Sequence, residues 1–551
     1  MQSIWLKSWP KGVPTIWEKP TETVAQKIFL WAQETPDHTA LIYYGRRFSY
    51  QELAQWVGRT ANALITTGIN PGDRVLLFMQ NTPQFVFSYL AAHAVGAVVV
   101  AANPMFMADE LRYELDDSKA SVLIAGRELA PVVEKALIGQ ESIPVIYADF
   151  DEFLPDNPVP AVHADMRRNP PEILPQRMLF RQWVASLEAI DPKSLNLDQD
   201  LALLQYTSGT TGQPKGAMLL HKNVLANVMG SILWTKVNQE SMHIAVLPLF
   251  HVTGMVHSFL APLYAGGTIL LMTRFETPTF VEAIDHYRPT HWVGIATMNI
   301  AVTQFPDIQK YHLDSLQACM SGGAPIPIPI LEKFHELTGA SLIEGYGLSE
   351  TISQVTVNPM DRPKMGSAGI PVFDVDLRIT EIGQFDHELT PGETGEIWVK
   401  GPQVMAGYWQ RPEATKEVLR ADGWFDTGDI GYVDPDGYLF ISGRSKELIK
   451  VSGFSVFPAE VESLLYKHPD IAEAVVIGVP DAYRGETVKA FVVLKPGAIT
   501  TGDQIVAWAR QEMAAYKAPR VVEIRESLPK NGSGKIMRRL LVDEETARTS
   551  G

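Results

Sequence analysis

The stretch Tyr206-Thr-Ser-Gly-Thr-Thr-Gly-Gln-Pro-Lys-Gly216 directly follows the strand-like run Leu201 to Gln205. Its glycines allow the backbone to approach a ligand closely, and successive N–H groups can form a nest for an anion. Lys215 adds positive charge, and hydroxyls or backbone groups come from Thr207, Ser208, Gly209, Thr210, Thr211 and Gly212. The spacing differs from both common nucleotide motifs, because Lys215 follows Gly212 after two residues. We interpret the stretch as a polyphosphate-binding loop; a flexible Ser/Gly loop is the competing interpretation.

Short apolar runs alternate with helical patterns on both sides of this loop. The runs are 74–78, 97–101, 121–124, 145–147, 244–247 and 268–272. This alternation predicts α/β layers around largely parallel sheets. From Gly366 onwards, short runs are separated by turn pairs such as Pro391-Gly392 and Asp436-Gly437, which predict an antiparallel sheet or a small barrel. We therefore expect an α/β fold with a β subdomain.

A second domain is expected towards the end of the chain. After a charged loop near Gly443, Phe457-Pro458 opens a helical pattern that is followed by two strand-like runs, a further helix and a basic tail. This is the length of a small α+β domain. We place the boundary between Ser442 and Lys446, which gives a large domain over 1–442 and a small mobile domain over 443–551.

Composition narrows the classes of function. The chain has 551 residues, of which 46% are hydrophobic and 20% charged, as in ordinary globular proteins, and a net charge of -16. A net negative charge argues against a nucleic-acid partner. Cys319 is the only cysteine and cannot form an internal disulfide, and the first residues lack the apolar core of a signal peptide, so we expect a cytoplasmic protein.

The longest apolar stretch runs from Phe85 to Ala102 and reaches the length of a membrane span. It contains Ser88, His93 and Gly96, and we interpret it as a helix, a glycine turn and a buried strand. No transmembrane segment is therefore expected, although the sequence leaves peripheral contact with a membrane open.

Six further motifs follow the phosphate loop in a fixed order. They are Leu247-Pro-Leu-Phe-His251, Ser321-Gly-Gly-Ala-Pro325, Glu344-Gly-Tyr-Gly-Leu-Ser-Glu350, Asp422-Gly-Trp-Phe-Asp-Thr-Gly-Asp429, Gly443-Arg-Ser-Lys-Glu-Leu-Ile-Lys-Val-Ser-Gly453 and Leu528-Pro-Lys-Asn-Gly-Ser-Gly-Lys535. The ordered set resembles the superfamily of acyl-CoA synthetases, peptide-synthetase adenylation domains and beetle luciferases. The resemblance runs from about Thr39 to Leu541. It implies ATP, Mg²⁺ and CoA as reactants and an acyl-AMP intermediate.

The resemblance also implies where the nucleotide binds. Adenine is expected to lie against the turn formed by Gly322, Gly323, Ala324 and Pro325. It is also expected to contact Tyr346, which belongs to the same motif as Glu344, Gly345 and Gly347. Glu350 is expected to hold Mg²⁺ together with Thr210, and Ser349 stands where the family usually has threonine. The ribose is assigned to Asp429 and Arg444. Taken alone, each of these motifs is an ordinary turn.

Two lysines are assigned to separate half-reactions. Lys535 resembles the family's adenylation lysine, and a cation there would offset the charge that develops when a carboxylate attacks the α-phosphorus. One arrangement cannot serve both half-reactions, so the small domain is expected to rotate about Lys446, where many relatives have aspartate. Lys450 and the loop to Gly453 would then face the site during thioester formation. The competing interpretation is that these lysines are simply solvated.

The acid is expected to have an uncharged tail. His251 occupies the position where relatives that activate amino acids carry an aspartate, and a buried ammonium without such a partner would be costly. His251 is assigned to the mouth of the acyl pocket, or else is a core histidine. The apolar walls are expected from Val252, Thr253, Trp292, Val293 and Gly294.

The resulting hypothesis is an acid:CoA ligase, an acid-thiol ligase that acts on a medium- or long-chain fatty acid. The runner-up substrate is an aryl acid such as a benzoate or cinnamate. Three further hypotheses stay open, namely transfer of the acyl group to a carrier protein, a luciferase-like oxygenase and a non-catalytic nucleotide sensor. Members of the superfamily commonly form homodimers, although nothing in these residues indicates one.

Overall fold

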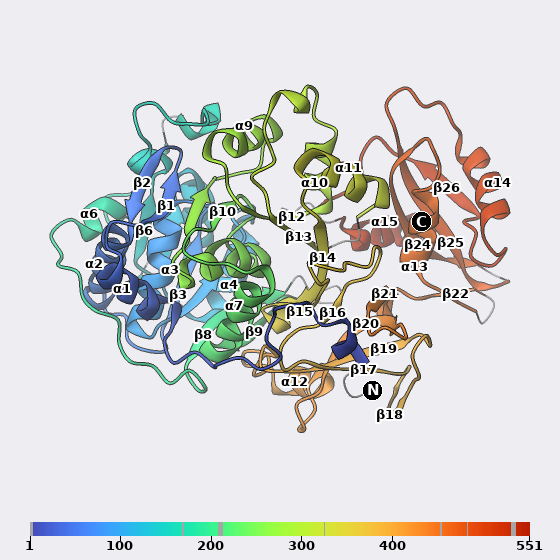
Figure 1. Ribbon diagram of the computed structural model, residues 1–551, viewed down its shortest axis with the longest axis horizontal. Coiled ribbons are helices and arrows are strands. Elements are labelled where there is room, and N and C mark those ends of the chain that lie inside the picture. Colours follow the sequence, from blue (N-terminus) through green and yellow to red (C-terminus); the bar gives the residue numbers. More distant parts are fainter. Residues whose placement is uncertain are drawn as a thin grey trace.

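The computed structural model describes residues 4–140, 142–167, 170–207, 213–323, 326–451, 454–481, 483–530 and 536–550. Several predicted site residues therefore lie outside the described residues. They are Ser208, Gly209, Thr210, Thr211, Gly212, Ala324, Pro325, Gly453 and Lys535. The fold is built from four sheets, which Figure 1 shows with their helices.

The first sheet has seven strands and ends at the predicted phosphate loop. Its order is β7 (Met178–Leu179), β6 (Val145–Ala148), β5 (Ala120–Gly126), β3 (Arg74–Phe78), β4 (Val98–Ala101), β8 (Leu201–Thr207) and β9 (Lys215–Leu220). All neighbours run parallel except β8 and β9, which are antiparallel. The parallel interior agrees with the near-continuous apolar runs in the sequence.

The second sheet has nine strands. Its order is β16 (Ile370–Pro371), β15 (Ser353–Val357), β14 (Leu342–Leu348), β13 (Ala318–Gly322), β12 (His291–Ile295), β10 (Met242–Ala245), β11 (Thr268–Leu271), β1 (Thr39–Tyr43) and β2 (Arg46–Ser49). The strands from β14 to β1 are parallel, whereas both ends of the sheet are antiparallel. The predicted parallel α/β layers are confirmed.

A single apolar core joins these two sheets. Alternate residues of each strand point into it, for example Leu77 of β3 and Val293 of β12, together with helices α1 (Val24–Glu34), α2 (Tyr50–Thr66), α3 (Pro83–Val95) and α7 (His221–Thr235). The other faces are covered by α4 (Ala108–Ser118) and α5 (Ala130–Ala136) on the first sheet and by α9 (Thr277–Tyr287), α10 (Ala296–Thr303) and α11 (Ile328–Thr338) on the second. The layers are therefore helix, sheet, helix, sheet, helix.

Helix α3 occupies the middle of this core. Every one of its residues is buried, and it ends at Gly96, whose φ of 77° is the left-handed conformation that glycine adopts readily. The buried strand β4 follows at once. The interpretation of this stretch as helix, glycine turn and strand is confirmed. None of the helices in the described part of the chain is both long and apolar enough to cross a bilayer.

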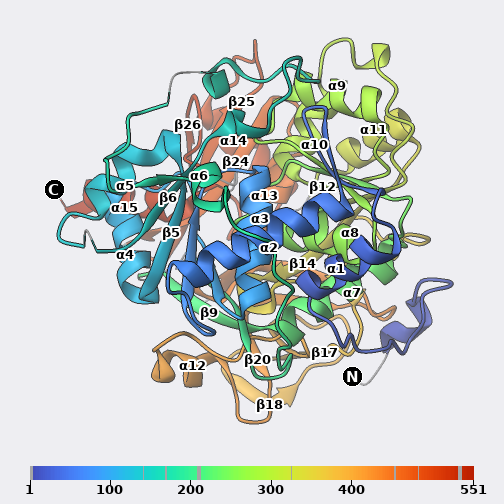
Figure 2. The same ribbon diagram turned by 90° about the vertical axis from the view of Figure 1, so that its left-hand side faces the viewer.

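The third sheet is antiparallel and forms the β subdomain. Its order is β18 (Gln384–Glu388), β17 (Asp376–Glu381), β19 (Gly395–Lys400), β20 (Phe425–Val433) and β21 (Leu439–Arg444), and the short helix α12 (Pro412–Val418) lies beside it. Figure 2 shows this sheet and α12 at one end of the molecule, below the two large sheets. The prediction of an antiparallel sheet is confirmed.

The last part of the chain forms a fourth sheet with cores of its own. Its strands are β23 (Phe454–Val456), β22 (Ile449–Val451), β25 (Gly485–Leu494), β24 (Ile471–Asp481) and β26 (Val521–Ile524). Helices α13 (Pro458–Leu465), α14 (Gly502–Glu512) and α15 (Arg538–Ser550) pack on it. Figure 1 shows this unit to the right of the large sheets. The basic tail predicted from sequence is thus largely helical, whereas the boundary between Ser442 and Lys446 and the hinge stay predictions.

Candidate active site

The two ends of the predicted phosphate loop face each other across a strand pair. Strand β8 ends at Thr207 and β9 begins at Lys215, and these two residues are partners in the antiparallel register. The loop is therefore the connection of a hairpin whose two strands are fixed in the sheet. The Lys215 ammonium lies 5.1 Å from the centre of the Tyr408 ring, a cation–π contact.

Tyr408 joins Lys215 to Glu350, and the sequence analysis did not identify it. Its hydroxyl donates a hydrogen bond of 2.8 Å to Glu350 Oε1, and the Met405 N–H donates to the Glu350 carbonyl oxygen at 2.8 Å. Burial, and then the neighbouring Glu350 carboxylate, raise the pKa of Tyr408, so the phenol remains a donor. The structure thus brings the predicted phosphate lysine and the predicted Mg²⁺ carboxylate to one place.

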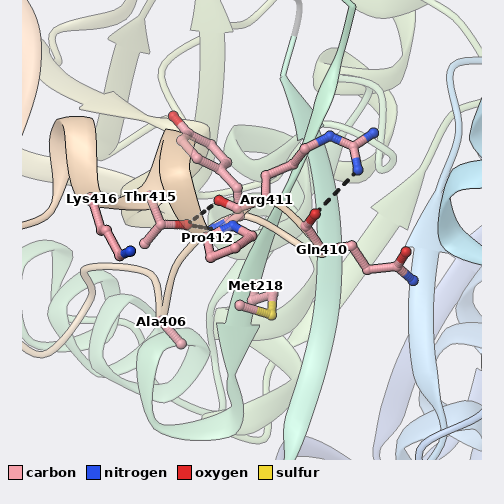
Figure 3. A pocket seen from close by; sticks show the side chains of 8 residues that line it. Met218, Ala406, Gln410, Arg411, Pro412, Thr415 and Lys416 are labelled. Atoms are coloured by element: carbon pink, nitrogen blue, oxygen red, sulfur yellow. Dashed lines mark hydrogen bonds between the residues drawn. The ribbon is translucent and has the colours of Figure 1, made fainter.

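The segment that carries Tyr408 runs alongside β9. The Met218 N–H donates to the Gly407 carbonyl oxygen at 2.9 Å, and the Trp409 N–H donates to the Gly216 carbonyl oxygen at 2.8 Å. Segments far apart in the sequence therefore form one wall. A hollow of about 430 Å³ adjoins this wall, lined by Met218, Ala406, Tyr408, Gln410, Arg411, Pro412, Thr415 and Lys416 (Figure 3). These lining residues include none of the predicted site residues.

Tyr346, Asp429 and Arg444 form a second cluster where the nine-stranded and five-stranded sheets meet. The Tyr346 hydroxyl donates to Asp429 Oδ2 at 2.6 Å, and Arg444 Nε lies 3.2 Å from Asp429 Oδ1. Asp429 and Arg444 are register partners in β20 and β21. Burial, and then the charge of Asp429, raise the pKa of Tyr346. A carboxylate oxygen has two lone pairs, so an aspartate at this position is chemically able to accept hydrogen bonds from hydroxyl groups.

Glu344 holds the chain that follows the predicted adenine turn. Strand β13 leads through Gly322 to Gly323, which has a φ of 82°, and Glu344 Oε1 accepts a hydrogen bond of 3.0 Å from the Ile326 N–H. Burial raises the pKa of Glu344 to about 7. A side chain of the neighbouring strand β14 therefore holds Ile326, the first described residue after the turn.

Packing requires the glycine after Tyr346 and leaves little space for a side chain at the glycine before it. A Cβ atom at Gly347 would lie 1.2 Å from the Ser353 carbonyl oxygen, and one at Gly345 would lie 3.1 Å from the Thr356 carbonyl oxygen. Both contacts are made by the antiparallel strand β15. The Gly-Tyr-Gly pattern thus has a structural cause in addition to any role in binding adenine.

The predicted acyl-pocket residues divide between the two faces of the nine-stranded sheet. Val252 and Val293 belong to the central core, and the His251 Nδ1 atom accepts a hydrogen bond of 3.3 Å from the Thr253 N–H. Trp292 instead lies in the core on the opposite face, where its ring packs against Phe280 and Phe334. The structure therefore does not bring Trp292 together with His251.

The cause is the alternation of side chains along a strand. A Cβ atom at Gly294 would lie 2.8 Å from the Trp292 ring, so Gly294 also points towards that opposite face. Of the predicted β12 residues, Val293 alone remains a candidate for the acyl pocket. Val293 and Val252 belong to the same apolar core, and their place in an acyl pocket stays a prediction.

A π-helical segment, η5 (Gly254–Leu260), begins three residues after His251 and packs against β10, β12 and α7. Such segments are uncommon and occur frequently at functional sites. Within it, both imidazole nitrogens of His257 are engaged, Nδ1 with Ser231 Oγ at 3.0 Å and Nε2 with Ser353 Oγ at 2.9 Å. Burial lowers the pKa of His257 to about 4, so the ring is neutral.

Helix α7 fixes the backbone around Glu350 through side chains that the sequence analysis also missed. Asn227 donates to the Thr351 carbonyl oxygen at 2.9 Å and accepts from the Gln354 N–H at 2.9 Å. Asn223 donates to the Pro402 and Val404 carbonyl oxygens. With Ser231, these residues recur every four positions on one face of the helix. This four-residue spacing is the sequence feature from which the role of α7 could have been predicted.

The predicted hinge and thioester residues lie at the start of the fourth sheet. Lys446 belongs to the short helix η8 (Ser445–Glu447), and Lys450 is exposed in β22, where its N–H donates to Glu486 Oε2 at 2.7 Å. Arg538 bridges Glu447 and Glu462.

Among the described residues, no group of three or more His, Cys, Asp or Glu side chains is arranged to hold a metal ion. Glu350, fixed by Tyr408, fits the carboxylate expected for Mg²⁺, whereas Thr210 lies outside the described residues.

Comparison with known families gives two matches. The profile of the AMP-binding enzyme family covers residues 28–409, and that of the AMP-binding enzyme C-terminal domain covers residues 460–535. A long-chain-fatty-acid–CoA ligase of Bacillus subtilis (strain 168) is 38% identical over 558 aligned positions, which cover 99% of this chain and 98% of that protein. A feruloyl-CoA synthase of an Amycolatopsis species is also 38% identical, with 92% of this chain and 96% of that protein covered.

Solved structures resemble the whole fold. The anthranilate CoA ligase AuaEII in complex with anthranoyl-AMP has a TM-score of 0.87 at 26% identity, covering 97% of this chain and 99% of that chain. ATP-bound MatB from Rhodopseudomonas palustris has a TM-score of 0.83 at 29% identity, covering 95% and 99%. Both similarities extend across the large sheets and the fourth sheet.

Proposed function

The chain belongs to the AMP-binding enzyme family and is an AMP-forming acyl-CoA ligase, and from this premise we propose that its acid is a medium- or long-chain fatty acid. The observation that carries the substrate proposal is the similarity to the Bacillus subtilis fatty-acid ligase over nearly the whole of both chains. The apolar surroundings of Val252 and Val293, without an acidic anchor at His251, support an uncharged tail.

The proposed roles of the nucleotide-binding residues follow from the two clusters. The hairpin loop and Lys215 bind the phosphates, and Tyr346 with the turn after β13 holds the adenine. Asp429 and Arg444 hold the ribose. Glu350, together with Thr210, would hold Mg²⁺, which supplies charge to offset the leaving pyrophosphate. Tyr408 orients the Glu350 carboxylate for this task.

Catalysis proceeds in two steps. In the first, a carboxylate oxygen of the acid attacks the α-phosphorus of ATP, the bond to the bridging oxygen breaks, and pyrophosphate leaves. We assign Lys535 to the stabilisation of the developing charge in this step. In the second, the CoA sulfur attacks the acyl carbonyl carbon and AMP leaves, with Lys450 facing the site after rotation of the small domain. His251 is assigned to the mouth of the acyl pocket.

An aryl acid is the second candidate. The similarity to feruloyl-CoA synthase, at the same identity as the fatty-acid ligase, favours it. The position of Trp292 on the opposite face of β12 removes one aromatic side chain from the proposed pocket wall and argues for an alkyl chain. A cytoplasmic location remains a prediction from sequence, whereas a homodimer, which is common in the superfamily, and peripheral membrane contact stay open.

The test is acid-dependent release of pyrophosphate from a graded panel of fatty acids and aromatic acids, each with and without CoA. We expect the highest kcat/KM with a medium- or long-chain fatty acid and formation of the CoA thioester. A preference for benzoates or cinnamates would replace the fatty acid with the aryl acid. Turnover that needs a carrier-protein thiol instead of CoA would contradict the choice of thiol, and the absence of turnover with every acid would contradict the substrate proposal as a whole.

A further inference from the structure

Asp117, near the end of α4, is a junction between distant segments of the chain. Its side chain is only 9% exposed. Oδ2 accepts a hydrogen bond of 2.7 Å from the Tyr206 hydroxyl, and Oδ1 pairs with the Arg411 guanidinium at 2.5 Å. The Asp117 carbonyl oxygen also accepts from Trp409 Nε1 at 3.1 Å. A single residue of α4 thus holds β8 and the segment after Tyr408.

Helix α4 is hydrogen-bonded to both ends of the predicted phosphate loop. Tyr206 is the residue before Thr207, where β8 enters the loop, and it is bound by Asp117. Tyr113 lies one turn earlier on the same face of the helix and donates a hydrogen bond of 2.7 Å to the carbonyl oxygen of Pro214, which directly precedes Lys215. The entry and the exit of the loop are therefore both held by one rigid helix.

The other partners of Asp117, Arg411 and Trp409, belong to the segment whose Tyr408 contacts Glu350. Arg411 and Trp409 belong to the wall segment beside β9, and Figure 3 shows Arg411 next to Gln410 in this segment. The Trp409 ring lies 5.8 Å from the Arg74 guanidinium, and its backbone N–H is bonded to Gly216. One residue before Trp409, the Tyr408 side chain contacts both Lys215 and Glu350. Asp117 is thereby connected to the predicted phosphate lysine, Lys215, and to the predicted Mg²⁺ carboxylate, Glu350.

The negative charge of Asp117 is well suited to holding these segments together. Burial, and then the charge of Asp117, raise the pKa of Glu114, which lies one turn earlier on α4 and is buried. The charge of Asp117 is the main cause that raises the pKa of Arg411. The pair is therefore a charge-assisted hydrogen bond between a buried carboxylate and a partly exposed guanidinium, and such a bond is stronger than a neutral one.

We propose that Asp117 is a positioning residue for the nucleotide, holding the phosphate loop and the Tyr408 segment in one arrangement around ATP. The proposal rests on the roles proposed above for Lys215 and Glu350. Asp117 would touch neither ATP nor the acid. Because a misplacement of about 1 Å can cost about 100-fold in rate, loosening this junction should impair the step in which pyrophosphate leaves.

The experiment compares Asp117→Ala with Asp116→Ala. Asp116 is the exposed neighbour on the same helix and is bonded to the Gln140 side chain, and its replacement removes the same charge. We expect Asp117→Ala to lower acyl-AMP formation by about 30-fold and to raise the KM for ATP, while thioester formation from supplied acyl-AMP stays within about 3-fold. Asp116→Ala should behave as the unmodified protein. Asp117→Asn, which keeps an acceptor for Tyr206, should recover part of the loss.

A second measurement does not depend on the acid. Mg-ATP should raise the melting temperature of the unmodified protein and of Asp116→Ala, and it should raise that of Asp117→Ala much less. An undiminished ATP-induced shift in Asp117→Ala, together with an unchanged KM for ATP, would overturn the proposal. Equal losses in both half-reactions, with a lower melting temperature in the absence of ATP, would overturn it in favour of a purely structural role.

Two milder variants cover the case in which Asp117→Ala does not fold. Tyr206→Phe and Arg411→Met each break one link of the junction, and each should lower acyl-AMP formation by a smaller factor; wild-type rates in both would overturn the proposal. Failure of the substrate proposal is recognised separately. In that case the unmodified protein turns over none of the acids, whereas the ATP-induced shifts still decide the role of Asp117.

Discussion

The hydroxyl of Tyr408 donates a hydrogen bond of 2.8 Å to the Glu350 carboxylate. Tyr408→Phe removes this bond and keeps the ring on which Lys215 lies. Because a hydrogen bond to a charged group contributes about 1.5–3 kcal/mol, we expect acyl-AMP formation to fall by about 10-fold or more. The measurement is acid-dependent pyrophosphate release over a range of Mg²⁺ concentrations. Tyr432→Phe, which removes a hydroxyl from a tyrosine stacked on Phe440, is the control and should retain full activity.

The buried carboxyl group of Glu128 is expected to make the free energy of unfolding depend on pH. Its Oε1 atom is buried and has no hydrogen-bond partner within the described residues. Burial is the main cause that raises the pKa of Glu128 to about 7; a hydrogen bond from its own backbone N–H opposes this, Asp149 adds to it and Arg274 opposes it. When the pKa of a carboxyl group is higher in the folded than in the unfolded state, the group contributes to the free energy of unfolding. This contribution is fully present below the unfolded pKa of about 4.3 and is lost as the pH rises through the folded pKa of about 7.

The corresponding variant is Glu128→Gln, which has the same shape and no charge. At pH 8 we expect its free energy of unfolding to exceed that of the unmodified protein by on the order of 2 kcal/mol, since it avoids the cost of a buried carboxylate. At pH 4 the two proteins should differ little. Urea unfolding at both pH values measures this, and a gain that is independent of pH would show that ionisation of Glu128 is not the cause.

At the scale of elements, helix α7 is expected to be the support of the Glu350 turn. Asn227→Ala leaves the Thr351 carbonyl oxygen and the Gln354 N–H without their partner in a buried place. Each such loss costs about 1–3 kcal/mol, so we expect a destabilisation of about 2–6 kcal/mol in urea unfolding. Asn62→Ala is the matched control, because Asn62 lies on α2 and its side chain donates an exposed hydrogen bond to the Glu188 carbonyl oxygen. A destabilisation no larger than that of the control would contradict this role of α7.

The same elements show what the sequence could predict. Helix α3 and strand β4 were predicted because glycine stops the helix and a run of valines suits a strand buried on both faces. The place of Trp292 could not be predicted, because the pattern of β12 identifies a strand without telling which face holds the pocket. Tyr408 was missed for another reason. Its role comes from the pairing of its segment with β9, and a contact between distant segments leaves no local periodicity.

At the scale of the whole molecule, the fourth sheet has its own apolar cores, formed by residues between Ile449 and Leu541. Its helix α15 is held within the same unit through Arg538, which pairs with Glu447 and Glu462. A unit with its own core can move as a rigid body, and two half-reactions with different chemistry require two arrangements around one nucleotide. We therefore expect Lys535 to serve the first half-reaction and Lys450 to lie on the side presented in the second.

This expectation is tested by separating the half-reactions. Lys535→Ala should lower acyl-AMP formation by at least about 100-fold, because a cation near the α-phosphorus is lost, and should largely spare thioester formation from supplied acyl-AMP. Lys450→Ala should show the opposite pattern. Lys530→Ala is the matched control, since Lys530 lies in the same glycine-rich motif but pairs with Glu473 at 2.6 Å. If Lys535→Ala slowed both half-reactions equally, one fixed arrangement would serve both steps, and the rotation of the small domain would lose its chemical reason.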